Sequence, residues 1–215
     1  MKPRLFAALL VLCCAPLLAQ APAAAPATQT HSSDIGFTYG IPADWEVVDT
    51  QPTLPVVKQQ QTQTATTEDE KKGIACVQIA LTAKHGNPAS VVVAVALPFD
   101  CFGQQMSDKD LPGFAAGASE GLKKTFEISD PVYGAYSLGT HSVWIERATG
   151  SLIGHPEVKY TVETVCSVLK KGAVCWMAMA ADDAGLQTFE KGAVTLDGEA
   201  PAALVPADAF QKKPL

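Results

Sequence analysis

Two patterned stretches separated by a Gly-bearing break constrain the fold of this chain most. Tyr160–Leu169 alternates apolar and polar residues, and Ala173–Ala181 does so less cleanly, with Lys170, Lys171 and Gly172 between them. Alternation of this length is the period of a β-strand with one face on a core, and a short break between two such runs predicts a hairpin. We therefore expect an antiparallel sheet with this hairpin as its central arm.

The register of the hairpin predicts a disulfide. A four-residue loop, Leu169–Gly172, in which Gly172 takes a left-handed backbone, sets Cys166 opposite Cys175. A three-residue loop would set Cys166 opposite Trp176 and separate the sulfurs. The first register matches the apolar faces of the two strands, whereas a slip by one residue would turn one apolar set outward. We expect a Cys166–Cys175 disulfide, with two unbonded core thiols as the alternative.

The first residues have the parts of a secretory signal peptide. Lys2 and Arg4 precede the apolar run Leu5–Leu12, which continues through Cys13, Cys14 and Ala15 to Leu18, with Ala19 after it. A run this short is typical of a signal peptide rather than a membrane span. We expect cleavage after Ala19, which leaves an exported protein, periplasmic or extracellular. Lipidation at Cys13 is the alternative, but the residue before it is a leucine where a small residue is needed.

The charge balance disfavours two classes of partner. Loss of Lys2 and Arg4 with the signal peptide reduces 16 basic residues to 14 against 22 acidic ones, a net charge of −8. An acidic chain repels phosphate backbones and anionic lipid. We therefore expect no nucleic-acid partner, no membrane-surface role and no membrane span in the mature chain.

A second disulfide, Cys76–Cys101, remains by elimination, because an exported chain with four mature cysteines is expected to pair them. Two apolar strands, residues 74–81 and 91–97, are predicted to pair with Val77 opposite Val95 and a turn centred on Gly86. Cys101 would then lie roughly 17 Å beyond the position opposite Cys76 if the strand continued. The bond therefore requires the chain to fold back at residue 98.

Composition divides the chain into a signal peptide (1–19), an Ala/Pro-rich disordered linker (20–32), one folded domain (33–196) and a loosely packed tail (197–215). Residues 50–72 are rich in Gln, Thr and charge, and we expect a mobile surface excursion there. Short strands are predicted at 35–41, 45–48, 132–138 and 141–148.

Two helices are also predicted, one before the strand at 132–138 and one after the central hairpin. Leu111–Phe126 follows Asp110 and carries an apolar stripe beside Gly113, Gly117 and Gly121. Each interior glycine costs ~1 kcal/mol against alanine, so we expect close approach of the helix to the sheet as compensation. Asp182 or Asp183 is expected to cap a short second helix with apolar positions at 186, 189, 193 and 194.

The segment Gly36–Trp45 reads G-F-T-Y-G-I-P-A-D-W. It resembles the opening "G-F-x-aromatic-x-aliphatic-P-x-x-W" of PsbP-like domains, and the order of elements up to residue 196 fits as well. The chain also resembles small exported bacterial proteins of that fold with no assigned activity. The resemblance implies an α+β fold, an antiparallel sheet flanked by helices in an α/β/α sandwich. Family members serve as photosystem subunits or assembly factors, or bind a GTPase, and none of their interface residues can be placed here.

No motif for catalysis, metal or cofactor binding is found. His31, His85, His141 and His155 stand alone in the sequence, without the spacing of metal ligands. A nucleophilic thiol could be built from Cys101 with His141 or His155 as base, but its neighbours Phe and Asp raise a thiol pKa. We expect no catalytic, cofactor-binding or metal residues and no cofactor.

The sequence thus favours a non-enzymatic binding or assembly domain with an unknown protein partner in the envelope. The glycine-lined helix, the long excursion and the rim of the sheet are the candidate surfaces. The alternatives are a carrier of a small apolar ligand, held between sheet and helix, and a thiol-dependent hydrolase on the same scaffold.

Overall fold

The computed structural model describes residues 28–211 except positions 53, 88, 121 and 125. The predicted signal peptide with its cleavage site after Ala19, and positions 20–27 of the predicted linker, lie outside the described residues. Within the described part, eleven strands and five α-helices form a mixed α+β fold with antiparallel sheets. None of the helices described there is long and apolar enough to cross a membrane.

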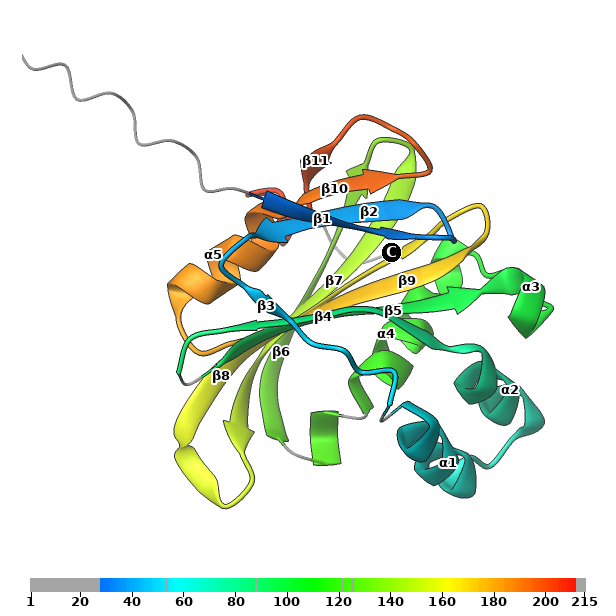
Figure 1. Cartoon of the computed structure of the whole chain (residues 1–215), viewed down its shortest axis with the longest axis horizontal. Coiled ribbons are helices and arrows are strands. Elements are labelled where there is room, and N and C mark those ends of the chain that lie inside the picture. Colours follow the sequence, from blue (N-terminus) through cyan, green and yellow to red (C-terminus); the bar gives the residue numbers. More distant parts are fainter. Residues whose placement is uncertain (1–27, 53, 88, 121, 125, 212–215) are drawn as a thin grey trace, which may run out of the picture.

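Seven strands form the larger sheet (Figure 1). They are β3 (Glu46–Val47), β4 (Gln78–His85), β5 (Ser90–Pro98), β6 (Phe126–Leu138), β7 (His141–Leu152), β8 (His155–Val168) and β9 (Gly172–Ala180). Their spatial order is β3-β4-β5-β9-β8-β7-β6, and each neighbouring pair is antiparallel. The predicted strands at 132–138 and 141–148 belong to β6 and β7, which are longer than expected because their pairing continues as far as Phe126 and Leu152.

The central hairpin, β8 with β9, has the predicted register, with Cys166 opposite Cys175. The expected role of Gly172 is wrong, because this residue begins β9 and its φ is not positive. A Cβ added there would lie 2.7 Å from the backbone oxygen of Leu97 and 3.1 Å from Ile35 Cγ2. A glycine is therefore required at this position because a neighbouring strand lies close to it, and not because of the turn.

The predicted pairing of Val77 with Val95 is wrong. Val77 is the C-cap of a helix, and β4 begins one residue later, so that Ile79 pairs with Val95. A register shift between Ile79 and Leu81 then changes the pairing along the rest of the ladder. Gly86 lies in the turn as expected, with a φ of 80° that favours glycine.

A second sheet lies above the first and was not predicted. It contains β1 (Thr28–Ser33), β2 (Phe37–Pro42), β10 (Ala193–Leu196) and β11 (Ala202–Ala203), in the order β1-β2-β10-β11. The predicted linker therefore ends too late, because residues 28–32 already pair with β2. The predicted second helix is also shorter, since residues 193 and 194 belong to β10.

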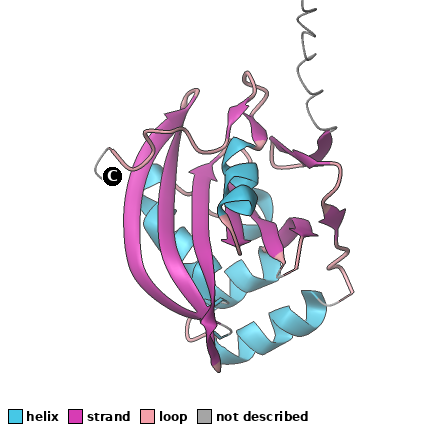
Figure 2. Ribbon diagram, turned by 90° about the vertical axis from the view of Figure 1, so that its left-hand side faces the viewer, coloured by secondary structure: helices cyan, strands magenta, loops and turns pink. Residues whose placement is uncertain are grey.

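The larger sheet is covered on both faces (Figure 1 and Figure 2). The second sheet and α5 (Asp183–Lys191) pack on one face through a large apolar core around Trp176, where the Phe37 ring lies 5.1 Å from the indole. On the other face, α4 (Leu111–Glu120) packs over Trp144 and the Cys166–Cys175 pair. One covering layer is thus part sheet and part helix, whereas the sequence predicted helices on both faces.

The helix α4 differs from its prediction in length and in the role of its glycines. It ends at Glu120, and after a 3₁₀ turn, η2 (Leu122–Lys124), the chain enters β6. The preceding turn η1 (Asp108–Asp110) carries a capping box between Ser107 and Asp110. A Cβ added at Gly113 or Gly117 would meet nothing within 4 Å, so the predicted close approach to the sheet is wrong. These glycines face solvent.

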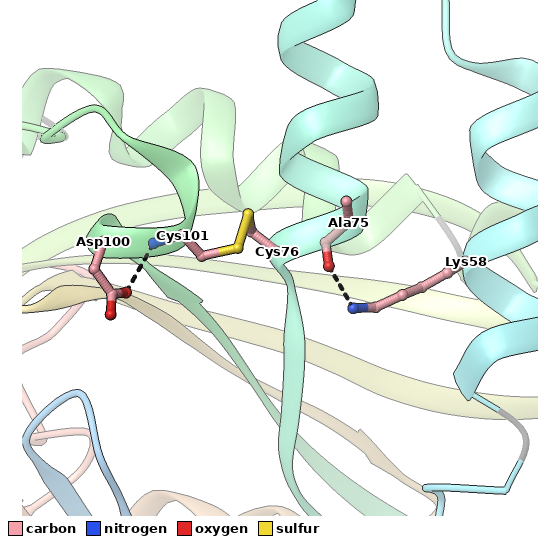
Figure 3. The surroundings of a disulfide bond; sticks show 5 residues. All are labelled: Lys58, Ala75, Cys76, Asp100 and Cys101. Carbon is pink, nitrogen blue, oxygen red and sulfur yellow. Dashed lines mark hydrogen bonds between the residues drawn. A yellow bond between two sulfur atoms is a disulfide. The ribbon is translucent and has the colours of Figure 1, made fainter.

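The predicted mobile excursion at 50–72 contains two helices, α1 (Leu54–Thr64) and α2 (Glu68–Cys76). Thr67 and Glu70 form a capping box at the start of α2. Lys58 Nζ donates to the carbonyl oxygen of Ala75 at 2.7 Å, which links the two helices (Figure 3). Local capping thus gives this polar segment a structure that its composition did not suggest.

The prediction of a loosely packed tail at 197–215 is wrong for the residues described. Leu204 and Ala209 are buried, with 0% and 1% of their surface exposed. The Tyr136 hydroxyl donates to the carbonyl oxygen of Leu204 at 2.6 Å. We call residues 202–211 the C-terminal cover. Positions 212–215 lie outside the described residues.

The strand β6 ends the larger sheet on the side away from β3. Asp130 has a left-handed φ of 54°, and the pairing with β7 shifts between Ser129 and Val132. Pro131 within this irregular stretch has no N–H to offer a further strand. A bulge and a proline are devices by which natural sheets block an exposed edge.

Candidate functional site

The thiol enzyme predicted as an alternative does not fit the structure. Cys101 lies in α3 (Phe99–Phe102) and is bonded to Cys76 at the end of α2, with 5.5 Å between the Cα atoms (Figure 3). Residues 99–103 fold back after Pro98, which is the condition that the sequence set for this disulfide. Because the Cys101 sulfur is in this bond, it is not available as a nucleophile.

The two histidines proposed as its base contact other parts of the chain. His141 Nδ1 lies 3.1 Å from the carbonyl oxygen of Val168, and its Nε2 lies 3.5 Å from Asp197 Oδ2. His155 Nδ1 lies 3.3 Å from Glu157 Oε1 on the surface. Among the described residues, no three His, Cys, Asp or Glu side chains gather as metal ligands would.

The other cysteine pair, Cys166–Cys175, is fully buried beneath α4. Its partners in this layer are Leu111 and Ala115 from the helix and Trp144 from β7. These side chains occupy the space between helix and sheet in which the sequence placed an apolar ligand.

An open groove lies at the rim of the fold, where the free edges of the two sheets meet. We call it the rim groove. It has a volume of about 320 Å³ and is lined by His31, by residues 47–51 and by residues 79–82. β1 is the edge of the smaller sheet, and the two-residue β3 is the edge of the larger one.

The shortness of β3 leaves part of β4 without a neighbour. Only Glu46 and Val47 pair with β4, and the Val48 N–H adds one bond to the carbonyl oxygen of Thr82. The Asp49 side chain then accepts a hydrogen bond from the Gln51 N–H at 3.0 Å, and the chain turns away towards α1. In the described part of the chain, no strand pairs with residues 78–81 on this side.

Polar atoms in the rim groove lack partners within the described protein. His31 Nε2 and Thr82 Oγ1 are both shielded from solvent and accept or donate no hydrogen bond there. Burial lowers the pKa of His31, so the neutral imidazole is favoured. Val47, beside these atoms, keeps 43% of its surface exposed. The unpaired strand edge and the exposed valine are the groups that an added extended chain would contact.

His85 and Trp45 stand near the same edge. The imidazole stacks on the indole with 5.6 Å between ring centroids, and its Nε2 lies 3.4 Å from Asp44 Oδ2. Trp45 itself is buried, with 5% of its surface exposed. These contacts hold the turn that leads into β3.

A partly buried charged cluster on the other side of the fold was not predicted from the sequence. Arg147 Nε on β7 donates to Glu163 Oε2 on β8 at 2.5 Å, and Arg147 Nη2 donates to Glu190 Oε1 on α5. Glu163 has no exposed surface, and its Oε1 has no partner among the described residues. The sequence signal that could have indicated this cluster is a pair of opposite charges at facing positions of a hairpin, because Arg147 and Glu163 lie opposite one another in the β7–β8 register.

Burial raises the pKa of Glu163 to about 7, and the guanidinium of Arg147 only partly opposes this shift. The pKa values of Tyr39 and Tyr136 are also raised, chiefly by burial and further by the charge of Glu163. Perturbed groups of this kind mark functional sites in many proteins, but this cluster is covered by α5 and the C-terminal cover.

Known proteins similar to this chain are found among solved structures. No family model matches the chain, and no curated protein matches it. Among solved structures, the chain is similar to cyanobacterial PsbP from Synechocystis sp. PCC 6803, studied in solution. The match covers 79% of this chain and 89% of that chain, at 12% identity and a TM-score of 0.40. That protein bears the name of the family whose opening motif Gly36–Trp45 resembles.

Proposed function

We propose that this chain is an exported, non-enzymatic binding domain of the PsbP-like α/β/α kind, and that it takes an extended segment of a protein partner in the rim groove. The observation that carries the proposal is the unpaired edge of β4 beside this groove. Peptides that add a strand to an exposed sheet edge gain affinity from main-chain hydrogen bonds and specificity from neighbouring pockets.

The surroundings of the groove support such a partner. Exposed sheet edges are usually blocked in natural proteins, and β6 at the far end of this sheet is blocked by a bulge and Pro131. The edge beside the groove has instead the exposed Val47 and the unpartnered His31 and Thr82 atoms. The two disulfides fit a chain that works in an oxidising compartment, which supports export.

The test is site-specific photo-crosslinking in the native envelope. A photoreactive residue at Val47 is expected to cross-link a protein partner, whereas one at Ile153 is not. Ile153 is a matched control, because it is equally apolar, is 50% exposed and lies in the β7–β8 turn rather than the rim. Val47→Lys should abolish partner capture, since a lysine on an edge discourages strand addition, and Ile153→Lys should not. Equal labelling from both positions would refute the proposal.

A further inference from the structure

The C-terminal cover lies directly on the charged cluster. The Phe210 ring stands over the Arg147 guanidinium at 4.5 Å, and the Val205 N–H donates to the backbone oxygen of Glu190 at 2.9 Å. The Leu204 N–H donates to the Gly192 oxygen at 3.0 Å. The cover therefore contacts the cation of the cluster through Phe210 and the helix bearing one of its carboxylates through Val205.

The charges beneath the cover do not balance when both carboxyl groups are ionised. Arg147 supplies one positive charge to Glu163 and Glu190. Glu163 has no exposed surface, whereas the side chains of Arg147 and Glu190 keep 32% and 21% of theirs, so the desolvation cost falls on Glu163. An uncompensated buried charge is strongly unfavourable unless it takes up a proton or regains water. A proton on Glu163 leaves the Arg147–Glu190 pair neutral, and the closed structure then needs no water at this place.

Among residues 28–211 that the structure describes, no other titratable group facing Glu163 supplies the missing charge. Tyr39 from β2 and Tyr136 from β6 lie in the field of this carboxyl group. Their hydroxyls donate to the backbone oxygens of Phe189 and Leu204 instead. On β9, the residue opposite Glu163 is Ala178. The proton on Glu163 is therefore the simplest way to keep this interior neutral.

We propose that the C-terminal cover is a pH-dependent latch, which closes tightly over the Arg147 cluster when Glu163 holds a proton and loosens when Glu163 ionises. Opening lets water reach Glu163 Oε1, and it detaches Phe210 from the guanidinium. The latch is independent of the rim groove, because it is built from β7, β8, α5 and the last described residues.

The direction of the effect follows from the two protonation equilibria. The pKa of Glu163 is about 7 in the closed state, against an ordinary value of 4.5 once water reaches it. The closed state therefore binds the proton more tightly, and its advantage is complete below pH 4.5. The free-energy advantage of the closed state over the open state falls between pH 4.5 and about 7. Above pH 7 both states are ionised at Glu163, and the advantage no longer changes with pH.

Amide hydrogen exchange at Leu204 and Val205 tests the latch, because the N–H groups of both residues are hydrogen-bonded only while the cover is closed. After correction for the chemical exchange rate, the opening constant should rise about tenfold per pH unit between 4.5 and 7 and then level off. Amides in the β5–β9 ladder should not follow this rise. A flat profile at Leu204 and Val205, or the same rise throughout the protein, would overturn the proposal.

Variants locate the responsible group. Glu163→Gln should give a flat profile, because the side chain no longer titrates. Glu146→Gln is the matched control, because burial also raises the pKa of the Glu146 carboxyl group. Glu146 lies opposite Thr164 in the β7–β8 register, and the Thr164 hydroxyl contacts Ser119 of α4, so Glu146 is on the other face of the sheet and its substitution should leave the rise unchanged. A rise that persists in a folded Glu163→Gln protein excludes the latch.

A further variant serves if Glu163→Gln does not fold. Glu190→Gln removes the competing carboxylate, so that Glu163 ionises more easily beside Arg147, and the rise should level off at a lower pH. An unchanged profile in this variant would also count against the latch. Phe210→Ala should raise exchange at every pH without removing the pH dependence, since it weakens the closed state but leaves the titrating group in place.

Discussion

The disulfide between Cys76 and Cys101 should be the main restraint on the two helices that precede β4. Cys76 is buried with 5% of its surface exposed, whereas Cys101 is exposed, so the variant of choice is Cys76→Ala with Cys101→Ser. The two cysteines are 25 residues apart. In the chain-entropy model, opening a loop of that length lowers the free energy of unfolding by about 3.5 kcal/mol.

Urea denaturation of the oxidised protein and the variant measures this change. With a slope of about 2 kcal/mol per molar urea, the transition midpoint should fall by roughly 1.7 M. Native-state hydrogen exchange gives the location, and amides of α1 and α2 should lose protection before those of β5 and β9. The link from α2 to α3 is the part of the structure that the variant breaks (Figure 3).

Mild reduction provides a control on the same bond without mutation. The Cys166–Cys175 pair is fully buried beneath α4, so a thiol reagent should open the Cys76–Cys101 bond first and give two titratable thiols. A midpoint shift below about 0.5 M, with unchanged exchange in α1 and α2, would refute the reasoning that this bond restrains the helices.

Three further predictions follow from packing and hydrogen bonding. Leu204→Ala should lower the free energy of unfolding by about 2–4 kcal/mol, because Leu204 is fully buried, and calorimetry or urea denaturation measures the loss; a change below 1 kcal/mol would mean that the cover is not packed. Gly172→Ala should destabilise the protein by about 1–3 kcal/mol, because the added Cβ would lie 2.7 Å from the backbone oxygen of a neighbouring strand. Gly113→Ala should instead stabilise α4 by up to about 1 kcal/mol, because the added Cβ would meet nothing within 4 Å. Equal effects of the two substitutions in thermal unfolding would contradict this. Tyr39→Phe should cost about 1–2 kcal/mol, since its hydroxyl donates to the buried Phe189 oxygen at 2.9 Å, and an unfolding curve that coincides with that of the parent protein would contradict it.

Local patterns predicted two of the hairpins, whereas the predicted β4–β5 register was wrong because β4 begins only at Gln78. The β8–β9 register follows from matching apolar faces around Cys166 and Cys175, and the turn between β6 and β7 follows from Gly139. In each case the pairing partners are close in sequence, so alternation and turn residues determine them. For the Cys76–Cys101 bond the sequence set only a condition, a fold-back after Pro98, and α3 meets it.

Contacts between distant segments could not be predicted in this way. β2 pairs with β10, which lies more than 150 residues later in the chain, and no local pattern relates Phe37 to Leu196. The apolar residues of β10 were assigned to the preceding helix, because Ala193 and Val194 continue its stripe. The helices α1 and α2 were missed because caps, a lysine contact and a disulfide stabilise them more than any apolar face does.

The charged cluster escaped prediction for a related reason. Alternation in β8 placed Glu163 on the strand face opposite to Cys166, and a polar residue at such a position is usually taken to be exposed. The second sheet and the C-terminal cover, which bury that face, come from the two ends of the domain. The β7–β8 register would have indicated the Arg147–Glu163 pair, but burial of that pair depends on these distant layers.

The unequal ends of the larger sheet limit how such a domain can assemble. At β6 the backbone is irregular around Asp130 and Pro131, so a second copy finds no continuous ladder to extend. At β4, residues 78–81 have no strand paired with them on the groove side within the described part of the chain, and the proposed guest would pair there. A protein that accepts a guest at only one end forms a stoichiometric pair and stops, whereas a sheet open at both ends could polymerise into fibrils.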